Sequence, residues 1–358
     1  MRKDKLAMIC PPGGETGRTL RLEITHEEAG HVIDGMLIDD STGARYPVIG
    51  GVPSFLGASV VADEAHASQS KTNVTFSDKW SKFKSYGMKP SEQEFLQEWY
   101  RKKFGLDSVA ELERLYAEFD TILEVGPGSG FNVRFAAEHT DGVVCALDIS
   151  DAAFTTFENT RDVANCLVVQ ADLMAAPFAD EQFDFVLADG VLHHTPDTRK
   201  AVAALYRKVK PGGRFFFYVY KRMGAIRQFA DRHIREAFTQ LEPEACYKAC
   251  EPLTELGKAL ADLKATVTLT KPIDILGIPA GTHDVQRLIY YNFLKCFWND
   301  AFDYETNNMV NFDWYHPHDA WQHSAEEIAG WMQELGVRDY QLNDANPNGL
   351  SVMLRKPR

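Results

Sequence analysis

A glycine-rich turn behind an apolar run constrains this chain more than any other feature of its sequence. Residues 121–125 read Thr-Ile-Leu-Glu-Val, and residues 126–130 read Gly-Pro-Gly-Ser-Gly, before a helical pattern that begins near Asn132. Glycine permits the positive backbone angles of a tight turn and lets a ligand approach the main chain closely. This order of strand, turn and helix predicts the cofactor-binding unit of an α/β fold.

Apolar runs alternate with helical segments along this part of the chain. The runs cover residues 121–125, 142–147, 166–170, 183–187 and 214–220. Strands that are apolar throughout and alternate with helices are typical of a mostly parallel sheet with helices on both faces. The predicted fold class is therefore α/β.

The spacing of the glycines separates two classes of cofactor. Enzymes that bind nicotinamide dinucleotides place Gly-x-Gly-x-x-Gly in this turn, with glycine or alanine at the last position. Here the glycines are Gly126, Gly128 and Gly130, and the next position holds the bulky Phe131. A pyrophosphate would be poorly accommodated, which disfavours an NAD-dependent dehydrogenase.

Carboxylates follow the second and third strands. Asp148 ends the second strand, where it could accept hydrogen bonds from both hydroxyls of a ribose. That arrangement is common to nucleoside cofactors of either kind. After the third strand, Asp172 could bind an adenine amino group while Leu173 packs on the ring, or Asp172 is an ordinary strand-to-loop aspartate.

These motifs, with two more further along, resemble the class I methyltransferase family. The additional motifs are residues 183–194, Phe-Asp-Phe-Val-Leu-Ala-Asp-Gly-Val-Leu-His-His, and residues 210–213, Lys-Pro-Gly-Gly. The resemblance covers roughly residues 119–220. It implies a Rossmann-like sheet, mostly parallel with an antiparallel last strand, to which β-like runs at 339–343 and 349–354 add the final two strands. It also implies S-adenosyl-L-methionine as the cofactor.

The resemblance assigns roles to individual residues. It implies that Glu124 helps to hold the methionine end of the cofactor and that Asp148 binds the ribose. Asp189 would lie beside the sulfonium and the methyl acceptor, where a carboxylate is electrostatically favourable. The cofactor-binding residues implied in this way are Glu124, Gly126, Pro127, Gly128, Gly130, Asp148, Ile149, Asp172, Leu173 and Asp189.

Two groups of residues are candidates for catalysis. Methyl transfer from a sulfonium is an in-line displacement, so a general base is needed only when the acceptor atom carries a proton that must leave. His193 and His194 stand where the fourth strand opens into a helix, a place where histidines of the family also serve packing. Asp313, Tyr315 and His316 cluster in a segment that is too polar to be simple hydrophobic core. They are either residues of the substrate pocket or parts of a structural loop held by hydrogen bonds.

The composition divides the chain into five parts. A linker is expected from Gly57 to Lys71. The section that follows it, called the lead-in, mixes aromatic and charged residues. Its charges are expected on a solvated helix face and its aromatic rings are expected to pack against the next domain. A helical insertion is expected to cap the carboxyl ends of the strands, with Asp313, Tyr315 and His316 reaching the acceptor pocket. The predicted parts are a small β-rich module (1–57), the linker and lead-in (58–118), the cofactor-binding core (119–220), the helical cap (221–320), and a final helix with the closing hairpin (321–358).

The β-rich module resembles the Trm112-like zinc-ribbon segment that precedes some methyltransferase domains. The resemblance rests on Cys10-Pro11 and on the run at 46–56. In that family four cysteines hold zinc, whereas Cys10 alone survives here. Tetrahedral zinc needs about four ligands, so we expect no metal. The six scattered cysteines are expected to be reduced thiols.

The charge balance narrows the choice of partners. With 38 basic and 51 acidic side chains the formal net charge is −13, which disfavours nucleic acid. No apolar run is long enough to span a membrane. We therefore expect a cytoplasmic enzyme that methylates an oxygen, nitrogen or sulfur atom of a small organic molecule. An RNA or protein methyltransferase and a non-catalytic interaction protein with a vestigial cofactor fold remain the alternatives.

Overall fold

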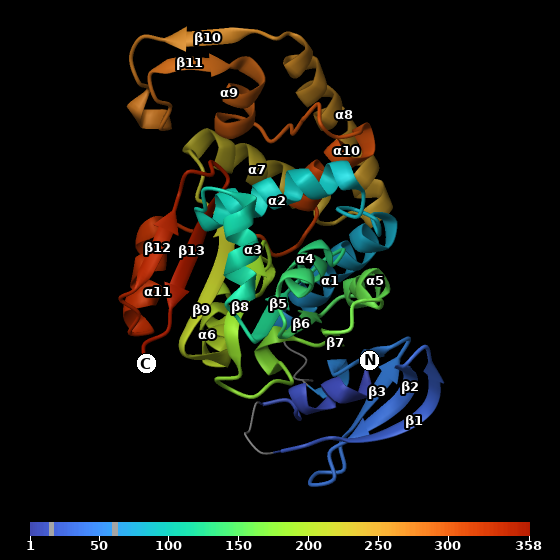
Figure 1. Ribbon diagram of the computed structural model, residues 1–358. Coiled ribbons are helices and arrows are strands. Elements are labelled where there is room, and N and C mark those ends of the chain that lie inside the picture. Colours follow the sequence, from blue (N-terminus) through green and yellow to red (C-terminus); the bar gives the residue numbers. More distant parts are fainter. Residues whose placement is uncertain (14–17, 59–63) are drawn as a thin grey trace.

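The computed structural model describes residues 1–13, 18–58 and 64–358. A twisted sheet runs through the middle of the molecule (Figure 1). Its strands pair in parallel except for the last one in the chain, which is antiparallel to both of its neighbours. The predicted Rossmann-like sheet is thereby confirmed. In spatial order the strands are β12 (Tyr340–Asn343), β13 (Gly349–Arg355), β9 (Val209–Tyr220), β8 (Phe183–Asp189), β5 (Thr121–Val125), β6 (Val143–Asp148) and β7 (Cys166–Gln170).

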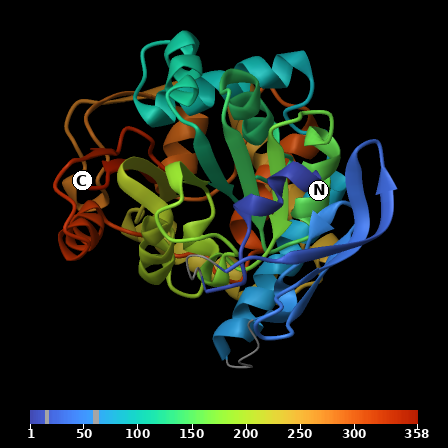
Figure 2. The same cartoon turned by 60° about the horizontal axis from the view of Figure 1, so that its bottom comes forward.

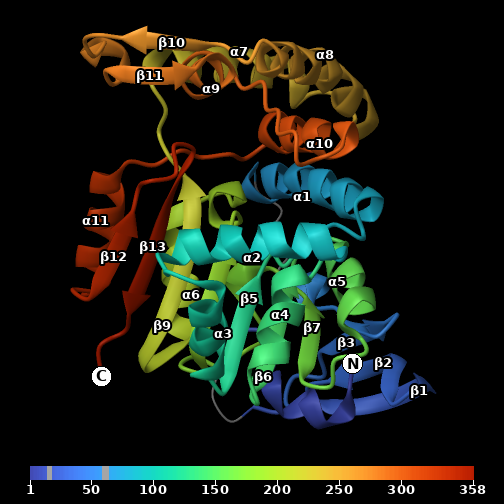
Figure 3. The same ribbon diagram turned by 45° about the horizontal axis from the view of Figure 1, so that its top comes forward.

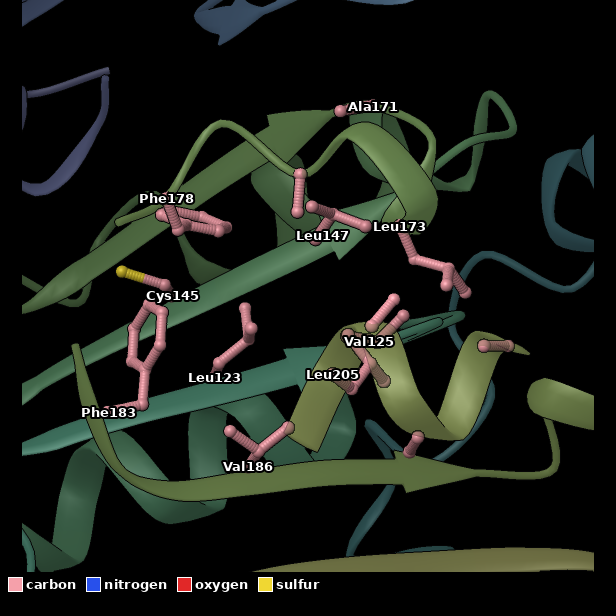
Figure 4. Close-up of a cluster of buried hydrophobic side chains, with 14 of the residues drawn as sticks. Leu123, Val125, Cys145, Leu147, Ala171, Leu173, Phe178, Phe183, Val186 and Leu205 are labelled. Atoms are coloured by element: carbon pink, nitrogen blue, oxygen red, sulfur yellow. The ribbon is translucent and has the colours of Figure 1, made fainter. Parts of the chain in front are cut away.

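Strand side chains alternate between two hydrophobic cores, one on each face of the sheet. On β5, Leu123 and Val125 belong to one core and Ile122 to the other. Figure 4 shows the first core, where Leu123 and Val125 lie near Leu205, a residue of the helix Thr198–Lys208 that covers this face. Each fully buried side chain of this size contributes about 1.5–3 kcal/mol through removal of apolar surface from water. Burial on both faces explains why these strands are apolar throughout.

Helices cover both faces. The core that contains Ile122 is completed by α3 (Val109–Ala117), α4 (Phe131–His139) and α5 (Ala152–Thr160). The core that contains Leu123 is completed by α6 (Thr198–Lys208) and α11 (Ala325–Glu334). Short 3-10 turns, η3 (Leu173–Ala175) and η4 (Leu192–His194), lie in the connections after β7 and β8.

The N-terminal part forms a separate small antiparallel sheet at the β7 edge, as Figure 2 shows. The backbone amide of Phe55 donates to the carbonyl of Gln170 at 2.8 Å, and the Ser54 hydroxyl donates to the Gln170 side chain at 2.9 Å. The predicted β-rich module is therefore present, and its likeness to a zinc ribbon stays a prediction. Its elements are η1 (Lys3–Met8), β1 (Arg21–Glu28), β2 (His31–Ile38), β3 (Arg45–Ile49), β4 (Val52–Pro53) and η2 (Leu56–Ala58).

The insertion lies at the opposite end of the molecule from the N-terminal sheet, beyond α1 (Glu64–Lys82) and α2 (Pro90–Phe104) (Figures 1 and 3). The helices of the insertion pack on one another and α10 also contacts α1. Its elements are α7 (Ala225–Phe238), α8 (Pro243–Asp262), β10 (Thr266–Leu269), η5 (Asp274–Leu276), β11 (Gly281–Asp284), α9 (Val285–Asn292) and α10 (Tyr304–Tyr315).

Two local predictions differ from the structure. Part of the predicted linker is helical, since α1 begins at Glu64, while residues 59–63 of that linker lie outside the described part of the chain. The insertion also contains the exposed hairpin β10–β11, which the helical prediction did not include. Within the described ranges, no helix is both long and apolar enough to cross a membrane.

Candidate active site

A cavity of about 810 Å³ lies at the carboxyl ends of the sheet strands. Its floor is formed by strand ends and the turns that follow them, including Val125, Asp148 and Asp189. Its other walls come from α1, α2, the insertion and the turn between β12 and β13. Ligand sites in open α/β sheets occur at this edge. The lead-in helices therefore build the cavity together with the insertion, rather than only packing against the core.

The glycine turn follows β5 directly. Gly126, Gly128 and Gly130 all have positive φ angles, of 67°, 60° and 85°. A Cβ atom at Gly126 would collide with the Val191 side chain, and one at Gly128 would collide with Trp80. Glycine is thus required for backbone conformation and for close packing at both positions. Gly126 and Pro127 line the cavity, whereas Gly128 and Gly130 do not and instead lie against Trp80 and Thr156.

Asp148 is held at the cavity wall by Ser150. Its Oδ1 accepts hydrogen bonds from the Ser150 backbone amide at 2.8 Å and from the Ser150 hydroxyl at 2.7 Å. Burial raises the pKa of Asp148 to about 6, against the lowering effect of these hydrogen bonds. Both Ser150 donors bind the same oxygen, and the Ile149 backbone also contributes to the stabilisation of the charged carboxylate. The neighbouring Ile149 lines the cavity as well.

Asp172 and Leu173 also line the cavity, as the sequence predicted for an adenine site. Asp172 is the N-cap of η3, where its Oδ1 accepts a hydrogen bond from the backbone amide of Met174 at 2.8 Å. The capping role accounts for one carboxylate oxygen. The structure therefore accommodates both interpretations of Asp172, because a cap does not occupy the whole carboxylate.

Glu124 lies just outside the cavity lining. Its carboxylate accepts a hydrogen bond from the Asn132 amide at 2.8 Å, and the Tyr116 hydroxyl donates to the Asn132 oxygen at 2.8 Å. Burial raises the pKa of Glu124 to about 8. Since Asn132 does line the cavity, Glu124 would influence a cofactor by orienting this amide.

Asp189 is paired with a buried lysine that sequence reasoning missed. The Lys103 ammonium group donates to Asp189, and it lies 3.9 Å from the centre of the Tyr218 ring and 4.6 Å from that of Trp99. Burial lowers the pKa of Lys103, while the Asp189 charge opposes that shift. The charge of Asp189 is therefore largely balanced within the protein.

The two adjacent histidines have different environments. His194 lines the cavity, and its Nδ1 donates to the Asp319 carbonyl at 2.6 Å, which leaves Nε2 as an acceptor. Burial lowers its pKa to about 4, so the ring is neutral at neutral pH. His193 is fully buried and stacks on Tyr220 with ring centres 3.7 Å apart, outside the cavity lining. Of the pair, His194 can meet a ligand directly.

In the polar cluster at the end of α10, too, one residue lines the cavity and the others do not. Asp313 lines the cavity and accepts an ion-pair hydrogen bond from Lys79 of α1 at 2.9 Å. Tyr315 donates to the carbonyl of Lys295 at 2.9 Å, and His316 bonds to Thr75 through Nδ1 at 2.8 Å. Neither Tyr315 nor His316 lines the cavity, which differs from the prediction.

The reason for this difference is helical geometry. The segment is the last turn of α10, not an open loop, so consecutive side chains point in different directions. His316 also bonds to the Leu241 carbonyl through Nε2 at 3.0 Å, which uses both ring nitrogens. Tyr315 and His316 thus hold neighbouring elements together, while Asp313 faces the cavity.

Lysine side chains are the cavity-lining residues that the sequence prediction missed. Lys79 and Lys103 belong to the lead-in whose charges were expected in solvent, yet each is at most 8% exposed. The signal that could have found them is the interleaving of lysines with tryptophans in residues 79–103. Lys295 in the insertion lines the cavity too. No group of three or more residues in the described ranges is arranged to hold a metal ion.

The comparison with protein families decides the nature of the core. Residues 123–217 match the family model described as a methyltransferase domain. This part of the chain is therefore similar to methyltransferase domains. S-adenosylmethionine is the methyl donor of such domains, and the motifs that predicted it, from Glu124 to the 210–213 turn, fall within the matched residues.

The names of the curated relatives of this domain include both C-methyltransferases and N-methyltransferases. The ubiquinone/menaquinone biosynthesis C-methyltransferase UbiE of Marinomonas sp. is 32% identical over 107 residues, which is 28% of this chain and 43% of that protein. Phosphoethanolamine N-methyltransferase 2 of Caenorhabditis elegans is 25% identical over 123 residues, 32% of this chain and 28% of that protein. The chain thus matches less than half the length of these curated relatives.

A solved structure resembles a larger share of the chain. The N-methyltransferase NodS from Bradyrhizobium japonicum WM9, in complex with S-adenosyl-L-homocysteine, is 13% identical and has a TM-score of 0.40. The likeness covers 80% of this chain and all of that one, 100%.

The residues present fit a nucleoside cofactor on structural grounds. The main chain of Gly126 and Pro127 lines the cavity directly after β5. Asp148 offers a carboxylate oxygen at the wall of the same cavity. Leu173 supplies an apolar surface nearby. These features serve the backbone-approach, ribose and adenine contacts that such a cofactor needs.

Proposed function

We propose that this chain is an enzyme that transfers a methyl group from S-adenosylmethionine to a small organic molecule. The observation that carries the proposal is that the cofactor turns and the insertion line one continuous cavity. Sites for a single organic ligand span about 300–1,000 Å³. A cavity of about 810 Å³ lies near the upper end of that range, as a site for a cofactor and a small acceptor should.

The residues that would hold the cofactor come from the core turns. Gly126 and Pro127 would lie against its methionine part, with Asn132 oriented by Glu124. Asp148 would accept the ribose hydroxyls, and Asp172 and Leu173 would bind the adenine. When bound, S-adenosylmethionine supplies a methyl group on a positively charged sulfur, which a nucleophilic atom can take up.

The remaining lining residues would position the acceptor and exclude water. Phe76, Trp80 and Trp314 contribute flat apolar surface to the cavity. Orientation of two reactants in such an enclosure can supply much of the rate of a displacement reaction. Where the acceptor atom carries a proton, Nε2 of the neutral His194 is placed to accept a hydrogen bond from it, and Asp313 is the carboxylate on the facing helix.

The acceptor atom that we propose is oxygen, nitrogen or sulfur, and the names of the C-methylating relatives add carbon to this set. Calorimetry of the full chain with S-adenosylmethionine tests the first half of the proposal, and binding in the micromolar range is the expected result. Transfer of a labelled methyl group to a small-molecule extract tests the second half. Absence of binding at millimolar cofactor would favour an interaction protein with a vestigial cofactor fold.

A further inference from the structure

In the part of the cavity that the insertion forms lies a buried lysine that pairs with no carboxylate of the described residues. Lys295 lines the cavity and is only 5% exposed. Among the described residues, its ammonium group has one side-chain hydrogen-bond partner, the Tyr290 hydroxyl at 3.3 Å. Burying an ammonium group costs free energy unless a negative group accompanies it. The cavity around Lys295 therefore lacks a negative group that would balance the charge of the ammonium group.

The carboxylates nearest to Lys295 are already engaged. Asp231 binds the Arg227 side chain at 2.8 and 3.0 Å and accepts a hydrogen bond from the Trp314 indole at 2.9 Å. Asp313 is paired with Lys79. Burial lowers the pKa of Lys295 to about 7, with a further lowering by Arg227. A negative ligand beside Lys295 would reverse this shift and keep the ammonium group charged.

Aromatic rings surround the same ammonium group. Its nitrogen lies 4.3 Å from the centre of the Trp314 ring, 5.4 Å from that of Tyr290 and 6.0 Å from that of Phe297. These contacts compensate part of the charge. They also place flat apolar surfaces beside the cation, which suits a planar organic group more than a bare inorganic ion.

A second cation reaches the same rings from α9. Arg287 lines the cavity, and its guanidinium lies 5.6 Å from the Tyr290 ring centre and 5.8 Å from that of Phe297. It donates to the Trp298 carbonyl at 3.1 Å, and within the described ranges no ion pair joins it to a carboxylate. This part of the cavity thus has an excess of positive charge, although the chain as a whole carries −13.

We propose that the methyl acceptor is a planar organic acid whose negatively charged group binds Lys295, with Arg287 close by. The proposal rests on the proposed function, because it assigns the acceptor half of the same cavity. Lys295 is a specificity residue in this scheme, since it selects the acceptor by charge. The aromatic rings hold the planar part of the acceptor between that charge and the methyltransferase core.

Three ligands with the same aromatic ring system and different charge test the proposal. They are 2-naphthoate, its neutral amide and 2-naphthylmethylammonium, titrated into the full chain that is saturated with S-adenosylhomocysteine. We expect the carboxylate to bind at least about tenfold more tightly than the amide, because a hydrogen bond to a charged group has about this effect. The ammonium ligand should bind least.

Variants then locate the preference. Lys295→Met keeps an unbranched apolar side chain among the rings and should reduce the preference to about twofold or less, whereas Lys295→Arg should retain it. Lys258→Met is the matched control, because Lys258 also lies over an aromatic ring, 5.5 Å from the Trp298 ring centre, but pairs with Asp262 at the surface. This control should leave the preference unchanged.

The outcomes separate this inference from the proposed function. Binding of S-adenosylhomocysteine to Lys295→Met shows that the variant is folded. If the carboxylate fails to bind at millimolar concentration, binds no better than the amide, or keeps its advantage in Lys295→Met, the inference is overturned while cofactor binding still supports a methyltransferase. If the cofactor does not bind but the protein still prefers the carboxylate, the proposed function fails, the bound acid is not a methyl acceptor, and only the anion-binding role of Lys295 stands.

Discussion

The proposed cofactor half of the cavity, formed by the turns after the sheet strands, and the proposed acceptor half, formed by α1, α2 and the insertion, differ in the contacts that hold their residues in place. In the cofactor half, several side chains are held by residues close in sequence, as Asp148 is by Ser150 and Asp172 is by Met174. Asp189, which pairs with the distant Lys103, is an exception. In the acceptor half, the contacts join residues far apart, such as Lys79 with Asp313, which are 234 positions apart. A substitution that removes a local contact alters one side chain or turn, whereas a substitution that removes a long-range contact affects the packing of two helices. We therefore expect substitutions in the two halves to have separable effects.

The largest effect is expected in the glycine turn. Gly126→Val places a branched side chain at a positive φ angle and against Val191, so cofactor affinity should fall by about a hundredfold or more. Calorimetry with S-adenosylhomocysteine measures this. Gly190→Ala is the control, since Gly190 has a similar φ of 74° and lines the cavity but has open space around it. Equal affinities in the two variants would contradict the importance of close packing.

A smaller loss is expected at the ribose site. Asp148→Asn removes the charge that accepts the hydroxyl groups and should weaken cofactor binding by about tenfold or more, with little change in the fold. Asp162→Asn serves as the control, because Asp162 is an exposed carboxylate paired with Arg134. Unchanged affinity in Asp148→Asn would show that the nucleoside is held elsewhere.

The acceptor half should respond differently. Lys79→Met breaks the contact between α1 and α10 and leaves Asp313 without its partner. The expected loss is about 1 kcal/mol of stability, discounted because a quarter of the Asp313 side chain, 26%, is exposed to solvent. Denaturant unfolding measures the loss, and a Lys79→Met/Asp313→Leu double variant should recover part of it. Turnover should decrease while cofactor affinity stays within about twofold, and a large loss of cofactor affinity would break the separation of the halves.

The smallest effect expected is a pH dependence of cofactor binding. Burial and the nearby Asp151 raise the pKa of Asp148 to about 6, and the charged form is the better hydrogen-bond acceptor. Cofactor affinity should therefore be steady above pH 7 and fall by a few-fold as the pH drops from 7 to 5, because the carboxylate becomes protonated. Asp148→Asn should lack this dependence. A rise in affinity on acidification would contradict the assignment.

The sequence allowed the cofactor half to be predicted because its signals are local. The strands β5, β7 and β8 begin where the apolar runs begin, at residues 121, 166 and 183. The glycine turn and Asp148 follow their strands by necessity, so their place at the sheet edge could be inferred. Boundaries set by pairing were less accurate, since β9 starts at Val209, earlier than the expected residue 214, and the β10–β11 hairpin was not expected.

The acceptor half could not be predicted in the same way because its side chains depend on tertiary contacts. Lysines in an aromatic and charged helix usually point to solvent, and only the docking of α1 and α2 over the sheet buries Lys79 and Lys103. Lys295 lies between helices in a stretch without regular structure, where no periodicity indicates its direction. Tyr315 and His316 were polar residues in the right segment, but the last turn of α10 directs them into hydrogen bonds with other elements.

The attachment of α1 to the end of the insertion has a consequence for the order of folding. Thr72 and Thr75 bond to Asp319 and His316 across 247 and 241 positions, so α1 cannot reach its final contacts until residues 316 and 319 have been synthesised. Contacts at such separation form slowly, because a long loop must close before any of them is made. The strands and turns of the cofactor half require much shorter loops. During biosynthesis the chain would therefore acquire a sheet with an open edge first, and the enclosed chamber would form only after residues 316 to 319 emerge.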